Sequence, residues 1–97
     1  MTSAKFNLGR VVATPGALEA IASAGQTPLL FLKRHHACDW GEVDSEDWET
    51  NEESLTSGAR ILSAYQTALG VRLWIITEAA DEFGRRPATT LLLPEEY

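Results

Sequence analysis

The sequence predicts an α+β domain, in which a helical N-terminal half packs on a small antiparallel sheet made of a hairpin and a third strand. In the first half, a Thr-Pro pair twice precedes a run of apolar residues, at Thr14-Pro15 and at Thr27-Pro28. Thr can cap a helix and Pro suits its first position, so each pair predicts a helix start. After Gly58 apolar and polar residues alternate, which is the period of a strand. The 97 residues fit a single domain over residues 1–97 with one modest core.

Three helices are predicted, near residues 15–24, 28–36 and 45–56. Gly25 ends the first, because glycine readily adopts the left-handed backbone that closes a helix. The apolar run after Pro28 is too short for its period to decide, so a buried strand remains the alternative there. Asp44 or Ser45 caps the third helix, whose first turn is acidic, as the positive end of a helix favours.

Three strands are predicted, near residues 60–67, 71–78 and 89–93. The first two form a hairpin through the short link at residues 68–70. Both faces of Trp74–Ile76 are apolar, which predicts that this strand is central and is covered by the helices. Residues 6–13 form a further candidate strand, because they contain two adjacent valines. Pro94 ends the last strand and leaves residues 95–97 as a tail.

The composition narrows the class of protein. The chain has 14 acidic and 8 basic residues and a formal charge of −6, which disfavours a protein that coats nucleic acid or an anionic membrane by bulk attraction. Its one cysteine excludes an intramolecular disulfide and fits a reducing compartment. The first 13 residues hold no apolar stretch of signal-peptide length, and no run approaches the ~18 apolar residues of a membrane span. We therefore expect a cytoplasmic protein without a membrane segment, and the sequence leaves its oligomeric state open.

The acidic residues are unevenly distributed. Eight of the 14 lie between Asp39 and Glu53, a stretch with no Lys or Arg. A solvated helix face is the simplest interpretation. The functional interpretation is a negative surface for a basic partner, because clustered like charge raises self-repulsion and steers association. On this hypothesis the partner is a basic protein surface, and the partner-binding residues are Glu42, Glu46, Glu49, Glu53 and Trp40. Trp48 and Trp74 are expected in the core, where aromatic side chains contribute most.

An alternative function is that of a small nuclease or toxin, whose site would consist of His35, Asp39 and Arg60. His35 or His36 would act as general acid or base, and Arg34 or Arg60 would bind phosphate. The acidic composition weighs against it, because such enzymes must hold RNA. His35, His36, Cys38 and Asp39 resemble metal ligands by residue type but lack a CxxC or HxxxH spacing, so no metal and no cofactor are predicted. We expect His35 to be structural, with a hydrogen bond across the turn between the second and third helices.

Five spaced blocks carry a family pattern: Arg34-His35-x-x-x-Asp39-Trp40-Gly41, Asp47-x-x-x-Asn51, Gly58-x-Arg60-Ile61-Leu62-Ser63-Ala64-Tyr65, Trp74-Ile75-Ile76-Thr77-Glu78 and Thr89-Thr90-x-Leu92-Leu93-Pro94-x-Glu96-Tyr97. With the opening segment 8–18 they cover nearly the whole chain. In these blocks the sequence resembles a family of small bacterial proteins usually labelled plasmid-related proteins, and sometimes labelled a type I restriction subunit. The resemblance carries over no catalytic residue. It implies a setting on plasmids and other mobile elements, where a small acidic protein could counter host restriction or CRISPR defence.

The chain departs from this family pattern in two places. Cys38 stands where the family tends to have Gly, and a residue with a Cβ disfavours a turn of positive φ. The loop over residues 79–88 is longer, with Arg85 and Arg86 as its basic residues. The leading hypothesis is a non-enzymatic acidic binding protein of a mobile element, such as an anti-CRISPR or anti-restriction inhibitor of a nucleic-acid-handling protein. The nuclease or toxin is the alternative, and the charge disfavours a DNA-binding accessory factor.

Overall fold

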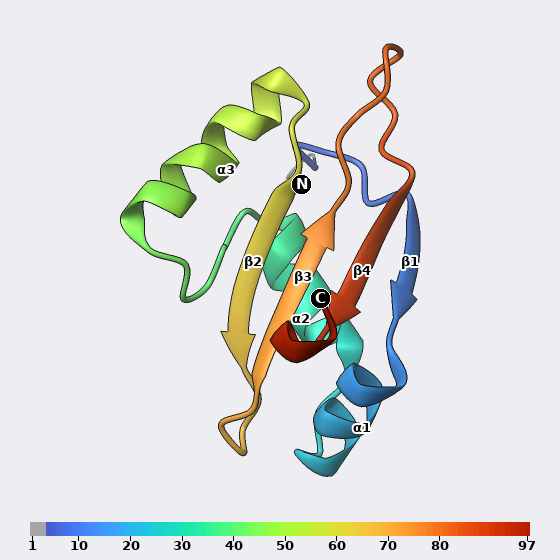
Figure 1. Ribbon diagram of the computed structural model, residues 1–97, viewed down its shortest axis with the longest axis vertical. Helices are drawn as coiled ribbons and strands as arrows, with labels where there is room; N and C mark the ends of the chain where they lie inside the picture. Colours follow the sequence, from blue (N-terminus) through green and yellow to red (C-terminus); the bar gives the residue numbers. More distant parts are fainter. Residues whose placement is uncertain (1–3) are drawn as a thin grey trace.

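A computed structural model describes residues 4–97 and shows three helices, a four-stranded sheet and a short 3₁₀ helix, η1 (Figure 1). Residues 1–3 lie outside the described residues. They are part of the N-terminal segment 1–13, in which the sequence predicts no signal peptide. The elements in chain order are β1 (Arg10–Ala13), α1 (Pro15–Ser23), α2 (Pro28–His36), α3 (Ser45–Ser57), β2 (Ile61–Gln66), β3 (Arg72–Thr77), β4 (Ala88–Leu92) and η1 (Pro94–Glu96). Within residues 4–97, no helix has the length and apolar character needed to cross a membrane.

The sheet confirms the α+β class but is mixed rather than wholly antiparallel. Its strand order is β1-β4-β3-β2, with β3 between β2 and β4 as expected. The pairs β2–β3 and β3–β4 are antiparallel, whereas β1 lies parallel to β4. A parallel pair needs a long connection between its strands, and here all of the helices and the β2–β3 hairpin lie between them. The sequence showed that residues 6–13 favour a strand but not which neighbour or direction it would take.

The first strand is also shorter than residues 6–13, because the chain bends at Gly9. Its φ is +64°, and a Cβ there would lie 2.2 Å from the carbonyl oxygen of Arg86. Only glycine tolerates both conditions. The chain before the bend leaves the sheet, and Phe6 is buried at 7% exposure.

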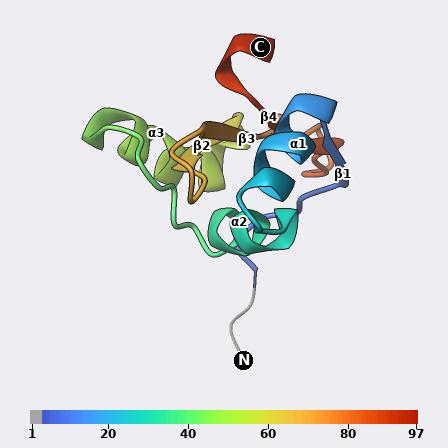
Figure 2. The same cartoon turned by 90° about the horizontal axis from the view of Figure 1, so that it is seen from below.

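The sheet has a different cover on each face. Figure 2 shows α1 and α2 on one side and η1 with the C-terminus on the other. The main core lies under the two helices and joins Ala17, Ile21, Phe31, Tyr65, Leu73, Ile75 and Leu91. On the opposite face the ring of Tyr97 packs edge-on against Trp74, so residues 95–97 are not a free tail. The prediction of helix for residues 28–36, over a buried strand, is confirmed.

The helix starts follow the sequence signals in two cases of three. The Thr14 hydroxyl accepts a hydrogen bond from the Ala17 N–H, and the Asp44 carboxylate accepts one from the Asp47 N–H. Thr27 has the extended backbone of a cap, but its side chain makes no capping bond. The start of α2 is therefore favoured by Pro28 at the next position, since the fixed φ of proline suits a helix.

A second cluster of buried residues, Phe6, Trp40 and Ile61, lies beside the main core. The expectation for the tryptophans was partly wrong. Trp40 is fully buried, Trp74 is half-buried, and Trp48 is 38% exposed. The reason is the position of α3, which flanks strand β2 instead of covering a sheet face (Figure 1). A helix at an edge buries a narrow stripe, which in α3 consists of Asn51 and Ser54.

The outer edge of β2 is closed by hydrogen bonds from the chain itself. The Asn51 side-chain amide donates to the carbonyl of Leu62 at 2.7 Å, and its oxygen accepts the N–H of Leu62 at 3.1 Å. Further along, the Ala64 N–H donates to the carbonyl of Trp40 and the Ala64 carbonyl accepts the N–H of Glu42. Unpaired edge strands can add foreign strands, so these contacts block that side of the sheet.

The turn after α2 has a residue with a Cβ, Cys38, in the left-handed backbone position. Cys38 has a φ of +64°, unlike any other non-glycine residue between positions 4 and 97. The N–H of Cys38 donates to His35, and the N–H of Asp39 donates to Arg34. This is the Schellman arrangement that closes a helix, and it normally places glycine at the left-handed position. The sequence placed a turn of positive φ in doubt at Cys38, and the turn has one nonetheless, because the paired hydrogen bonds hold the strained backbone in place.

The edge contact of Asn51 should contribute strongly to stability. We expect Asn51→Ala to lower the free energy of unfolding by about 2 kcal/mol, because it uncovers both backbone groups of Leu62. Glu53→Ala on the exposed side of α3 is the control and should change it by less than ~0.5 kcal/mol. Urea denaturation measures both. Equal stability of the two variants would show that the Asn51 contacts contribute nothing.

The strain at Cys38 should appear when Gly and Ala are compared at this position. Both variants lose the thiol, which packs on the second cluster, so their difference reports the backbone. We expect Cys38→Gly to be more stable than Cys38→Ala by about 0.5–1 kcal/mol in urea denaturation, because glycine adopts a positive φ without steric conflict. An alanine variant as stable as the glycine variant would contradict a strained backbone at this turn.

Candidate functional site: the acidic face of α3 and the His35 network

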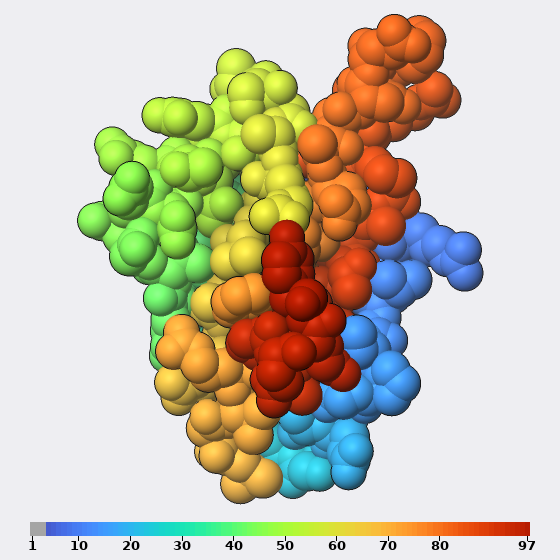
Figure 3. Space-filling view, in the orientation of Figure 1, coloured from blue at the N-terminus to red at the C-terminus, as the bar shows by residue number. Residues whose placement is uncertain are grey.

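The four glutamates of the predicted interaction surface are all exposed. Glu46, Glu49 and Glu53 have the spacing i, i+3, i+7, which places them on one side of α3. The buried residues Asn51 and Ser54 lie on the other side. Glu42 lies in the loop before the helix. The space-filling view shows α3 forming one flank of the molecule (Figure 3). We call Glu42, Glu46, Glu49 and Glu53 the acidic face.

None of the four glutamates of the acidic face forms an ion pair within the described residues. The ion pairs found among residues 4–97 join Arg34 to Asp39 and Arg85 to Asp81. Glu52 has a different role, because its carboxylate accepts the indole N–H of Trp40 at 2.8 Å. The acidic face thus keeps its repulsion, whereas Glu52 stabilises the fold.

Trp40 does not belong to an exposed binding surface, which corrects its prediction as a partner-binding residue. Its indole has 0% exposure. It packs beside the rings of Phe6 and His35, with centroid distances of 6.0 and 5.7 Å. Its N–H is satisfied by Glu52. Trp40 therefore anchors the loop that precedes α3 and acts on the acidic face only by positioning it.

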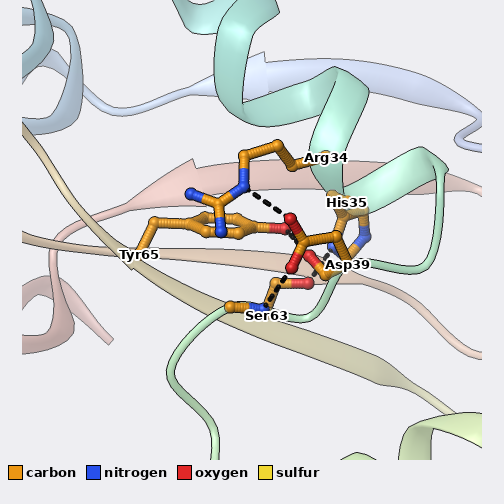
Figure 4. A network of polar contacts seen from close by, with 6 residues as sticks. Arg34, His35, Asp39, Ser63 and Tyr65 are labelled. Carbon is orange, nitrogen blue, oxygen red and sulfur yellow. Dashed lines mark hydrogen bonds and ion pairs between the residues drawn. The ribbon is translucent and has the colours of Figure 1, made fainter.

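His35 is fully buried between α2 and the sheet. Its Nδ1 pairs with the hydroxyl of Ser63 on β2, and its Nε2 lies 2.8 Å from the hydroxyl of Thr77 on β3. The predicted hydrogen bond of His35 across the turn between α2 and α3 was wrong, because both ring nitrogens instead pair with hydroxyls of the sheet. In Figure 4 the ring of His35 lies over Ser63, away from the exposed Arg34 side chain. Successive residues of a helix point about 100° apart, so His35 faces the sheet when its neighbours do not.

The hydrogen bonds around His35 continue across the sheet, and the donor and acceptor of each bond can be assigned. Thr89 donates its hydroxyl proton to the carbonyl of Leu8. The Thr89 oxygen must then accept from Thr77, which lies 2.7 Å away. A hydroxyl has one proton, so Thr77 in turn accepts from Nε2 of His35, and Nδ1 accepts from Ser63. The network therefore fixes His35 as the neutral tautomer protonated at Nε2.

Burial, with a smaller contribution from the nearby His36, lowers the pKa of His35 to about 3. The ring is neutral at pH 7, and both of its nitrogens are occupied. A general acid or base must reach the proton that it moves. His35 cannot reach a substrate in this structure.

Asp39 is held by Arg34 at the surface of the turn (Figure 4). The guanidinium Nε lies 2.8 Å from the carboxylate and holds the pKa of Asp39 below its usual value. The guanidinium also lies over the ring of Tyr65, 4.5 Å from its centroid. The Tyr65 hydroxyl donates to the backbone carbonyl of Asp39, and burial raises the pKa of that hydroxyl. These contacts fasten the turn to β2.

Arg60 lies on the opposite face of the sheet from His35. Its guanidinium donates to the hydroxyl of Tyr97, whose ring packs on Trp74. Side chains alternate between the faces of a strand, so Trp74 points away from the helices that cover Leu73 and Ile75. The structure therefore does not bring together His35, Asp39 and Arg60, the residues of the nuclease alternative.

The residues considered as metal ligands are engaged elsewhere. Nε2 of His36 pairs with the backbone carbonyl of Phe6 at 2.9 Å. Over residues 4–97 no group of three His, Cys, Asp or Glu side chains is arranged to hold a metal ion.

Arg86 is a structural residue that the sequence did not reveal. It is 6% exposed, and its guanidinium donates to the carbonyls of Ser54, Ala59 and Glu78. Burial lowers its pKa. It ties the end of α3 to the strands that follow, beside a mixed polar groove of about 380 Å³. In the sequence it follows the exposed Arg85 within a polar loop, and no pattern distinguishes the two.

The buried state of His35 should make stability fall in acid. The folded chain leaves this ring neutral down to about pH 3, whereas the unfolded chain protonates it near pH 6.5. The unfolded state thus binds more protons below pH 6.5, and the free energy of unfolding decreases there. We expect a loss of about 2 kcal/mol between ~pH 7.5 and ~pH 5 from urea denaturation.

His35→Gln should remove this acid sensitivity and should also lower the melting temperature at neutral pH, because the hydroxyls of Ser63 and Thr77 lose matched partners. Asn51→Ala serves as a destabilised control that retains His35. If both variants lost stability equally between these two pH values, the titrating group would be another residue.

Comparisons of the chain with protein-family models, with curated proteins and with solved structures give no match. The residues and contacts of this chain are therefore the basis for any assignment of function.

Proposed function

We propose that the chain is a non-enzymatic binding protein whose acidic face contacts a basic surface of another protein. One observation carries the proposal. Glu46, Glu49 and Glu53 share the exposed side of a helix, and the ion pairs of the described residues involve none of them. Repulsion of this kind destabilises an isolated domain, and a cationic partner would offset it.

The contacts of the candidate catalytic residues favour binding over catalysis. His35 is buried and neutral, Asp39 is paired with Arg34, and Arg60 lies on the other side of the sheet. Each of these residues has a structural partner. A nuclease would need at least two of them around one exposed phosphate site.

The proposed setting is the cytoplasm of a bacterium that carries a plasmid, phage or other mobile element. Its support is the resemblance of the spaced blocks to plasmid-related proteins. Proteins that handle nucleic acid present basic surfaces to phosphate groups. An acidic helix can occupy such a surface, so an inhibitor of a CRISPR or restriction complex fits this chemistry. Direct nucleic-acid binding does not, because the acidic face would repel phosphate.

The acidic face can be tested with charge-matched variants. One variant replaces Glu42, Glu46, Glu49 and Glu53 by Gln, and the control replaces four exposed glutamates elsewhere, Glu19, Glu78, Glu82 and Glu95. Both raise the formal charge of −6 by four, to −2. A partner is first isolated from bacterial lysate with the unmodified chain, and binding is then measured with the purified partner.

We expect the acidic-face variant to bind at least ~10-fold more weakly at low salt, chiefly through a slower association rate, and to show less salt dependence. The control should retain most of the affinity. The acidic-face variant should be as stable as the unmodified chain or more stable. Equal affinity of the two variants for the partner would contradict the proposal, and would show that the acidic face is only a solvated surface.

A further inference from the structure

The two edge strands of the sheet, β2 and β1, differ in whether their outer backbone groups are hydrogen-bonded. The edge of β2 is closed by Asn51 and by the segment 40–42. No strand among residues 4–97 pairs with the outer edge of β1, since β1 is the last strand in the order β1-β4-β3-β2. Figure 1 shows β1 at the margin of the molecule, far from α3. An open edge of this kind can accept another strand.

The hydrogen-bonding groups of β1 divide between the two sides of the strand. The N–H of Arg10 donates to Pro87 and the N–H of Thr14 donates to Leu91, so these residues face β4. Backbone groups alternate along a strand, so Val12 also faces β4. The N–H and carbonyl groups of Val11 and Ala13 face outward. The side chains of Val11 and Val12 remain 42% and 38% exposed, one on each face of the sheet.

We propose that β1 pairs with β1 of a second copy of this chain, antiparallel and about a two-fold axis at Val12. In this register Val11 lies opposite Ala13 of the second copy, and each such pair exchanges both of its backbone hydrogen bonds. The two Val12 residues form the close, non-hydrogen-bonded pair between them. Their β-branched side chains then contact each other across the axis. The pairing is self-complementary, as a two-fold interface requires.

Charge complementarity supports this register. Arg10 of one copy lies opposite Thr14 of the other, and the hydroxyl of Thr14 is bonded to the Glu96 carboxylate at 2.6 Å. The side chains of Arg10 and Thr14 share one face of the strand. Arg10 has no ion pair within the described range, so its guanidinium is available to Glu96 of the second copy. Two symmetric ion pairs would thus flank the valines.

The charge of the whole molecule permits this dimer. The acidic face lies beyond β2, at the opposite edge of the sheet from β1 (Figure 1). The two acidic faces would lie at the far ends of a continuous eight-stranded sheet, where their repulsion is screened over distances beyond about 10 Å. Because β1 has four residues, the interface is small and we expect a dissociation constant of about 10–1,000 µM.

The test is sedimentation equilibrium of the full chain from about 10 µM to about 1 mM. Val11→Pro removes an outward N–H and leaves the ladder to β4 intact, and it should weaken association at least ~10-fold. Val11→Thr keeps the N–H and the β-branch, and should associate like the unmodified chain. Circular dichroism checks that each variant is folded.

A second pair of variants tests the register without altering the backbone. Arg10→Gln should weaken association about threefold at low salt. Arg72→Gln, an equal charge change at the exposed first residue of β3, should have no effect. A chain that stays monomeric at the highest concentration overturns the proposal, and so does a dimer that Val11→Pro and Arg10→Gln leave unchanged. Neither result bears on the acidic face, whose test uses a different surface and a different partner.

Discussion

His35 places a polar ring where the two layers of the domain meet, and its two nitrogens bind hydroxyls on two different strands. From Thr77 the hydrogen bonds continue through Thr89 to the carbonyl of Leu8, which lies just before the bend into β1. This network of hydrogen bonds thus joins α2, β2, β3, β4 and the segment just before β1. Each hydroxyl in it, and the imidazole, has a defined donor or acceptor role. An apolar helix face could slide on the sheet with little penalty, whereas a displaced His35 would leave several buried polar groups unpaired. The depth and register of α2 therefore follow from this residue.

Local signals explain why so much of the fold was predictable. Thr14, Asp44 and the glycines after two helices act on neighbouring residues. The three predicted helices and the three strands after Gly58 agree with the structure to within about two residues, whereas β1 is shorter than the candidate strand 6–13. What the sequence could not show are relations between distant segments. The hydroxyls of Ser63 and Thr77 lie 28 and 42 positions from His35, so its structural role was predicted but its partners were not. For the same reason, Trp40 is buried although it was predicted on a binding surface, and Trp48 is exposed although it was predicted in the core. Their spacing does not reveal that α3 lies along an edge, where most of its surface stays exposed.

The position of α3 also explains how the acidic face is compatible with a stable domain. A helix on the sheet face would need an apolar stripe about a third of its circumference wide. At the edge, α3 is held instead by Leu55, which packs on the second cluster, and by three polar contacts: Asn51 on Leu62, Glu52 on Trp40, and Arg86 on the carbonyl of Ser54. The rest of its surface carries no packing requirement and is free to be acidic. The proposed function and the predicted partner-binding residues thus rest on an arrangement in which recognition and folding use different sides of one helix.

The unequal edges of the sheet limit how far copies of this chain can assemble. A sheet with two open edges can grow without end, since each added strand presents a new edge, and this is the geometry of fibrils. Here Asn51 and the segment 40–42 occupy one edge from within. If copies pair through β1 as proposed, that pairing uses the one strand edge left open over the described residues, and assembly stops at two copies. Loss of the Asn51 contacts would therefore have a cost beyond stability, because it would uncover the backbone of Leu62 on the second edge and leave only the segment 40–42 to block strand addition there.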